Sequence, residues 1–101
     1  MNCKVTSALF IEMNKIRKTQ QSSWNDLIAY LIQYADKPLE YQRDYKRKYE
    51  GKLQFFTLRF HESDWIKFAE FSAYFRNYPD LLDYLVYGEL NDLFINKKIG
   101  F

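Results

Sequence analysis

The sequence predicts a mostly helical fold with short β-strands, in which two strand-helix-helix units share one core. Two observations support this prediction. The stretch 23–32 aligns without gaps on 77–86, and the alternating segment 53–60 precedes the second copy. With 101 residues, of which 48% are hydrophobic and 20% aromatic, the chain has the length of one domain and enough apolar material for a core.

The repeated stretch predicts the start of a helix in each unit. Each copy begins with a typical N-cap residue, Ser23 or Asn77, and carries an acid three residues later, Asp26 or Asp80. This spacing is close to a capping box. Pro79 agrees with it, because proline is tolerated in the first turn of a helix. We therefore expect the second helix of each unit to begin just after these caps.

The first unit is expected over residues 1–36. Alternation over 2–6 predicts a short strand with Cys3 and Val5 facing inward. The outward side chains of this strand are Asn2, Lys4 and Thr6. A helix should follow, since apolar residues recur at helical spacing. These are Leu9, Phe10, Met13 and Ile16. The segment 20–23 is then the turn between the two helices.

Residues 37–52 form a basic linker between the units. The segment is long for a plain loop in a compact domain. Its tyrosines Tyr41, Tyr45 and Tyr49 are four residues apart, which predicts a short helix between Pro38 and Gly51. The cations of this linker are Arg43, Lys46, Arg47 and Lys48. They contribute to a net charge of +4 for residues 1–52, against −2 for residues 53–101.

The second unit is expected over residues 53–91. Its strand alternates between an inward and an outward set of side chains. The inward set is Phe56, Leu58 and Phe60, and the outward set is Phe55, Thr57 and Arg59. The segment 61–64 reads as a turn and cap, and apolar residues from Trp65 to Phe75 predict a helix over about 63–76. The tail, 92–101, shows no clear period.

Together these elements predict a DNA-binding ribbon. One strand-helix-helix unit cannot satisfy its own strand edge, so two strands should pair antiparallel with four helices behind them. Such a ribbon fits the major groove, where outward side chains meet base edges. Arg59 is the strongest candidate, because its guanidinium can donate two hydrogen bonds to guanine. The candidate base contacts are Arg59, Thr57, Phe55, Lys4, Asn2 and Thr6.

Phosphate contacts are expected at two further places. The first turn of each second helix has free backbone N–H groups and the positive end of the helix dipole, which suit a phosphate. The residues at these turns are Ser22, Ser23, Asn77 and Tyr78. The basic linker supplies the other candidates, which are Arg43, Lys46, Arg47 and Lys48. Contacts of this kind fix the register of the protein without reading the sequence.

The segment Phe55-Phe-Thr-Leu-Arg-Phe-His-Glu-Ser-Asp-Trp65 resembles the strand-to-helix passage of the MetJ/Arc ribbon-helix-helix superfamily. The segments 52–60 and 7–12 look like the second strand and first helix of the TraY proteins of conjugative plasmids, whose longer members carry two such units. The resemblance implies a tandem ribbon-helix-helix fold. It also implies a relaxosome accessory protein that binds near a transfer origin, bends DNA, assists the relaxase and acts in regulating transfer genes.

Two departures from this family pattern leave one question open. Neither turn between the helices contains the glycine usual in the family, and the first strand is short. The strands could therefore pair within one chain or between two chains of a homodimer. Alternative interpretations of single residues also stand beside the DNA contacts: Arg59 as a solvated strand arginine, Phe55 as an aromatic packed on the linker, and the linker cations as a solvated helix face.

Composition also bears on other classes of function. One cysteine, Cys3, and one histidine, His61, leave no intramolecular disulfide and too few ligands for a zinc site, so we expect neither metal nor cofactor. They also provide no nucleophile-base pair, so an enzyme is not expected. No apolar run reaches the length of a membrane span, which favours a cytoplasmic protein. The alternative function is a protein-protein interaction module or a phage or plasmid inhibitor, favoured by the acidic second half and the aromatic surplus.

Overall fold

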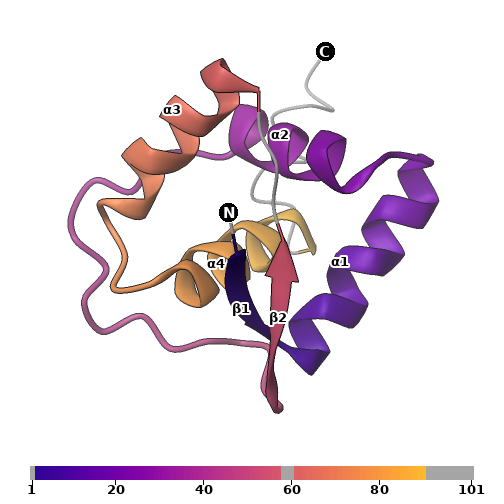
Figure 1. Cartoon of the computed structure of the whole chain (residues 1–101). Coiled ribbons are helices and arrows are strands. Elements are labelled where there is room, and N and C mark those ends of the chain that lie inside the picture. Colours follow the sequence, from indigo (N-terminus) through magenta and orange to yellow (C-terminus); the bar gives the residue numbers. More distant parts are fainter. Residues whose placement is uncertain (1, 58–60, 91–101) are drawn as a thin grey trace.

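The computed structural model describes residues 2–57 and 61–90, and it consists of a two-stranded ribbon with four helices (Figure 1). The elements are β1 (Asn2–Thr6), α1 (Ser7–Gln20), α2 (Trp24–Tyr34), β2 (Leu53–Thr57), α3 (Glu62–Ser72) and α4 (Tyr78–Leu90). The expected mostly helical fold with two short strands is confirmed. Leu58, Arg59, Phe60 and the tail lie outside the described residues.

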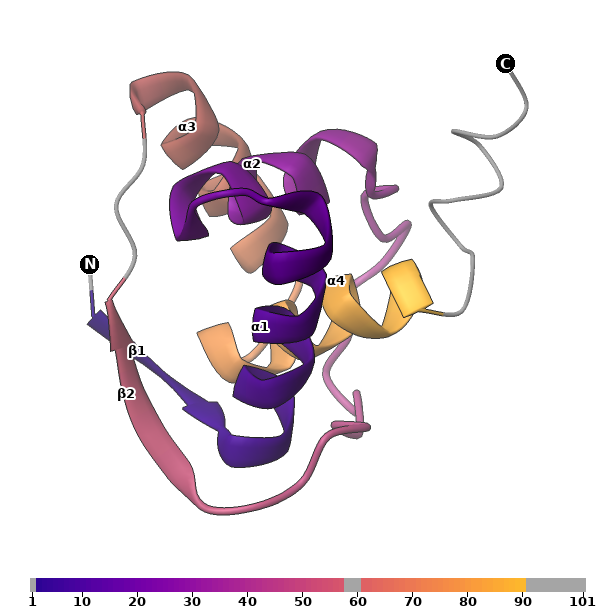
Figure 2. The ribbon, with the colours of Figure 1, turned by 90° about the vertical axis from the view of Figure 1, so that its right-hand side faces the viewer.

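The two strands pair antiparallel within one chain. In their register Lys4 lies opposite Phe55, and Thr6 lies opposite Leu53. Just beyond this pair, the Ser7 N–H donates to the carbonyl oxygen of Lys52 at 3.0 Å, which joins the start of α1 to the end of the linker. Figure 2 shows the ribbon at an edge of the molecule, with α1 and α4 on one side of it. The first and second halves of the chain therefore build one sheet.

A single hydrophobic core lies behind the ribbon and takes side chains from both halves. Its members come from β1, all four helices and the connection between α3 and α4: Val5, Leu9, Met13, Ile16, Leu27, Ile28, Leu31, Ile32, Phe68, Phe71, Phe75, Leu81, Leu82, Leu85 and Val86. Each copy of the repeat carries four apolar positions at helical spacing, 27, 28, 31 and 32 in the first and 81, 82, 85 and 86 in the second, and all of them are buried. Each fully buried leucine contributes roughly 1.5–3 kcal/mol relative to an exposed one, so the stripes fix the two second helices in the core.

The helix starts predicted from the repeat are confirmed. The Ser23 hydroxyl accepts a hydrogen bond from the backbone N–H of Asp26 at 3.1 Å, at the start of α2. The Asn77 side-chain oxygen accepts one from the N–H of Asp80 at 2.9 Å, at the start of α4. By contrast, α3 starts after His61 without a side-chain hydrogen bond at its cap.

The linker is not helical, so the helix predicted there is wrong. Residues 35–52 run along the second unit as a segment of bends and turns, in which the Gln42 N–H donates to the Tyr74 carbonyl oxygen at 2.7 Å. From this non-helical segment, Tyr45 and Tyr49 pack against the core. Gly51 adopts a φ of +128° on the way into β2, and a Cβ there would collide with the Ser7 hydroxyl.

The turn between α1 and α2 lacks glycine but adopts a conformation that favours one. Gln21 has a φ of 52° and a ψ of 43°, which is left-handed helical. Its N–H donates back to the carbonyl oxygens of Arg17 and Lys18, and this closes α1. A side chain with a Cβ is strained in this conformation, whereas glycine adopts it freely.

Replacing Gln21 with glycine should therefore stabilise the protein. We expect Gln21→Gly to raise the free energy of unfolding by roughly 0.5–1 kcal/mol, because the relief of strain exceeds the extra backbone entropy of glycine. Urea denaturation measures this change. The matched control is Gln20→Gly, one residue earlier and within α1, which should lower stability by a similar amount. Equal effects of the two substitutions would contradict the assignment of strain to Gln21.

Candidate nucleic-acid interface

The outer face of the ribbon carries three of the predicted base-contact residues. Phe55 is 76% exposed, and Lys4 and Thr57 are exposed as well. Lys4 places its Nζ 5.2 Å from the centre of the Phe55 ring, across the strand pair. The outward placement predicted from strand alternation therefore holds for these residues. The side chain of Asn2 and the whole of Arg59 lie outside the described part of the chain.

Thr6 does not face outward, contrary to the prediction from alternation. Its side chain is buried, where Oγ1 accepts from the Leu9 N–H at 3.2 Å and donates to the Tyr49 carbonyl oxygen at 2.7 Å. Alternation fails here because Thr6 is the N-cap of α1, so the chain already turns away from the strand direction. Thr6 is a structural residue that joins α1 to the linker.

A buried carboxylate holds two arginines at the start of α4. Arg76 donates from Nε and Nη2 to Asp80 Oδ2 at 3.2 and 3.1 Å. The Nε of Arg47 lies 3.3 Å from Asp80 Oδ1, an ion pair without hydrogen-bond geometry, since Oδ1 has no hydrogen-bond partner in the described residues. The Asp80 side chain is 0% exposed, whereas those of Arg47 and Arg76 are 35% and 51% exposed.

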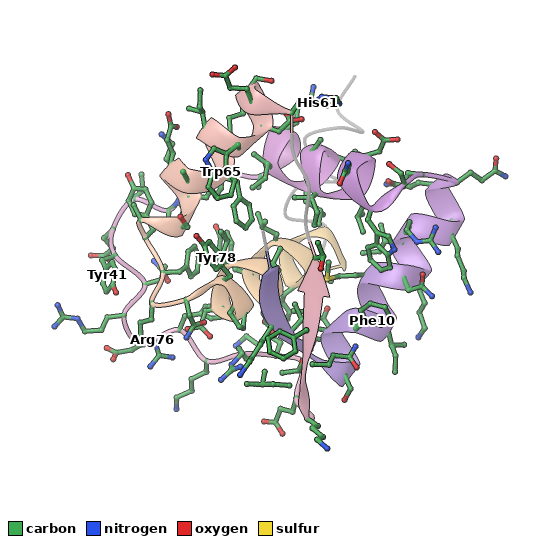
Figure 3. The ribbon with its side chains drawn as sticks, in the orientation of Figure 1. Phe10, Tyr41, His61, Trp65, Arg76 and Tyr78 are labelled. Atoms are coloured by element: carbon green, nitrogen blue, oxygen red, sulfur yellow. The ribbon has the colours of Figure 1, made fainter. Side chains whose placement is uncertain are left out.

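Arg76 is not among the contacts predicted from the sequence. The signal that could have found it is its spacing of four residues before Asp80, which places the two side chains on one face at a helix start. Arg76 also precedes the cap residue Asn77 directly. Figure 3 shows Arg76 and Tyr78 at the start of α4, on the side of β1.

Two of the other linker cations, Arg43 and Lys48, lie against aromatic rings. Arg43 lies over the ring of Tyr41, 5.7 Å from its centre. Lys48 lies between the rings of Tyr45 and Tyr87, with Nζ 6.0 and 5.3 Å from their centres. Of the predicted linker contacts, Lys46 and Arg47 line a pocket next to the ribbon.

A groove of about 540 Å³ connects the ribbon with the start of α4. We call it the ribbon groove; it is lined by Lys4, Arg47, Leu53, Phe55, Arg76, Asn77, Tyr78 and Pro79. Tyr78 forms its inner wall, with its ring stacked 5.5 Å from that of the buried Phe68. A second pocket of about 450 Å³ shares Arg47, Leu53 and Arg76 with it. Residues predicted from separate motifs, the strands, the linker and the second repeat, are therefore brought together here.

The start of α2 is arranged differently. The Ser22 hydroxyl is buried with no hydrogen-bond partner in the described residues. The backbone N–H of Ser22 donates to the Arg17 carbonyl oxygen at 3.0 Å. Ser22 therefore presents neither group to a phosphate, contrary to expectation. Arg17 donates to Asn14 at 3.2 and 2.9 Å and lies over the Trp24 ring. Ser23 is exposed, but its hydroxyl caps the helix.

A second buried carboxylate, Asp83, anchors the linker. It accepts hydrogen bonds from the N–H groups of Lys48 and Tyr49 at 2.9–3.1 Å and from the Tyr45 hydroxyl at 2.7 Å. Burial, followed by the hydrogen bond to Asp83, raises the pKa of Tyr45 above its ordinary value. Burial is also the main cause that raises the pKa of Tyr49 to about 12. Both hydroxyls are neutral at physiological pH.

Comparison with protein-family models, curated proteins and solved structures gives no match to this chain. None of the helices in residues 2–57 and 61–90 has the length and apolar character needed to cross a membrane. In the same residues, no group of three or more His, Cys, Asp or Glu side chains could hold a metal ion.

Alkaline pH should destabilise the fold, because the buried hydroxyls of Tyr45 and Tyr49 must then ionise. The pKa of Tyr49 in the folded state lies above its unfolded value of 10.0. The neutral Tyr49 hydroxyl therefore contributes its full stabilisation below pH 10, and this contribution is lost as pH rises towards 12. We expect Tyr49→Phe to lose less stability over this window than the unmodified protein, as measured by urea denaturation at several pH values. The control is Tyr41→Phe, which removes the same hydroxyl group from an exposed tyrosine of the same linker. Identical pH profiles for all three proteins would contradict this expectation.

Proposed function

We propose that the chain is a tandem ribbon-helix-helix protein that binds double-stranded DNA, with the β1–β2 ribbon in the major groove. The observation that carries the proposal is the pairing of one strand from each half, which leaves Lys4, Phe55 and Thr57 exposed on one face beside a cationic groove. A two-stranded ribbon has the width of the major groove. These side chains would then meet the edges of the bases.

The helix arrangement supports the tandem form of this fold. Each half supplies a strand followed by two helices, and α1 contacts α4 while α2 contacts both α3 and α4. Such contacts bury each unit's apolar stripe against the other unit, as expected for two units that cannot fold alone. The pairing of strands within one chain favours a ribbon completed by a single molecule.

The ribbon residues have chemistry suited to bases. A lysine such as Lys4 can donate to guanine O6 and N7, and an exposed ring such as Phe55 can contact a thymine methyl group. Thr57 offers a hydroxyl and a methyl group on the same face. The resemblance to the TraY proteins suggests the setting, a relaxosome accessory protein or transcriptional regulator in plasmid conjugation, with a relaxase as a protein partner.

A second candidate function is a protein-protein interaction module. The observation that favours it is the exposure of Trp65 and Ile66 on α3, together with Leu39 and Tyr41 in the linker. Exposed apolar side chains of this size are common at protein interfaces. This function predicts no affinity for duplex DNA, so one experiment separates the two.

Selection from a random pool of duplexes, followed by gel shifts over a salt series, tests the proposal. We expect affinity to fall steeply with salt, because bound phosphates release counterions. Lys4→Ala and Phe55→Ala should each weaken discrimination between selected and scrambled duplexes by roughly 5- to 150-fold, equivalent to ~1–3 kcal/mol.

The matched controls are Lys18→Ala and Ile11→Ala, which remove an exposed cation and an exposed apolar side chain from α1. They should leave discrimination unchanged. Absence of any duplex binding by the unmodified chain at low salt would overturn the proposed function and favour the interaction module.

A further inference from the structure

The two copies of the repeat differ at aligned positions around their helix starts. Directly before the two copies, Ser22 corresponds to Arg76, and within them Ala29 aligns with Asp83. The acid that both copies share also differs in its surroundings, because Asp26 is exposed whereas Asp80 is buried. These differences surround the linker, whose basic part hydrogen-bonds to Asp83 and Arg76.

Asp83 and Arg76 together fix the basic part of the linker on the second copy. Asp83 accepts the N–H groups on the far side of Arg47, at Lys48 and Tyr49. Arg76 donates from Nη2 to the Tyr45 carbonyl oxygen at 3.3 Å, on the near side of Arg47. The backbone on both sides of Arg47 is thus held against α4, and its side chain is directed to the ribbon groove.

The two guanidiniums retain donors for a further anion. Arg47 makes an ion pair but no hydrogen bond within the described residues, and Arg76 uses only Nε and Nη2. With Lys4, the groove holds three cationic side chains against the single carboxylate of Asp80, a surplus of two positive charges. Guanidinium groups match the oxygens of a phosphate, and a buried carboxylate limits the freedom they lose on binding.

The opposite helix start has no comparable arrangement in the described residues. All three guanidinium nitrogens of Arg17 are engaged, Nε and Nη2 with Asn14 and Nη1 with the Ser22 carbonyl oxygen, and the guanidinium covers Trp24. Asp26 adds an exposed negative charge at this end. Anion-binding capacity is therefore concentrated at the start of α4.

We infer that Arg47 and Arg76, held by Asp80, form a clamp for one phosphodiester of the DNA backbone. The chain accordingly binds its target in a single orientation, with strong phosphate contacts on one flank only. This inference rests on the proposed function and adds to it an asymmetry that the repeat by itself does not predict.

Salt dependence tests the clamp. Arg47→Gln and Arg76→Gln should each reduce the slope of log affinity against log salt by about 0.9, the value for one lost phosphate contact. Lys37→Gln, in the same linker, and Arg17→Gln, at the opposite helix start, should leave the slope unchanged. Arg47→Lys keeps the charge and should retain the slope, which separates loss of a phosphate contact from loss of folding. Unchanged slopes in the Arg47→Gln and Arg76→Gln variants would overturn the inference.

Ethylation interference tests the orientation. In the unmodified complex, ethylated phosphates should block binding on one flank of the site, and Arg47→Gln should abolish this block. Equal interference on both flanks would overturn the single orientation.

If the chain binds no duplex, the proposed function fails and the clamp is tested alone by titration with inorganic pyrophosphate. Shifts of the Asn77 and Tyr78 amide resonances that disappear in Arg47→Gln would support an anion clamp. No shift in the unmodified protein would overturn it.

Discussion

Pairing of β1 with β2 is the constraint on which the rest of the structure depends. Each strand has five residues and pairs with the other, so neither half of the chain can complete a sheet alone. Bringing Asn2 opposite Thr57 requires the two helices and the linker between the strands to fold back within a short distance. The hydrogen bond from the Ser7 N–H to the Lys52 carbonyl oxygen holds the end of the linker at the end of the ribbon.

Two buried carboxylates determine how the linker makes that return. Asp80 and Asp83 both lie on α4 and are fully buried, a costly position for a charge unless it is well compensated. Asp83 is compensated by backbone N–H groups and a tyrosine hydroxyl, and Asp80 by two arginines and the N–H-rich start of its helix. The interactions that compensate these two carboxylates also hold the linker in place. This arrangement also brings Arg47 beside the ribbon.

The parts of the fold that the sequence predicts well are those determined by neighbours in the chain. The caps at Ser23 and Asn77 and the apolar stripes of α2 and α4 follow from spacings of three and four residues. The linker could not be predicted in the same way. Its tyrosine spacing suits a helix, but the N–H groups of Lys48 and Tyr49 are bound by Asp83, which is more than thirty residues away in sequence. Local patterns carry no information about such a partner.

The candidate site shows the same division. Strand alternation correctly placed Lys4 and Phe55 outward, but it failed at Thr6, where the strand ends and capping takes over. Arg76 was missed because its role depends on the burial of Asp80, which a sequence does not reveal. Likewise, Ser22 and Arg76 hold equivalent positions directly before the two copies of the repeat but differ in environment. Arg76 lines the ribbon groove, whereas the Ser22 hydroxyl is buried beside α1 and α2.

The most direct test of the central claim is an NMR titration of the protein with a selected duplex, observing contacts between the Phe55 ring and protons in the DNA major groove. Insertion of the ribbon predicts nuclear Overhauser effects from the Phe55 ring to thymine methyl or cytosine H5 protons. Amide shifts should then concentrate at Lys4, Phe55 and the start of α4. Shifts confined to α3 around Trp65 and Ile66, without contacts from Phe55, would contradict the account.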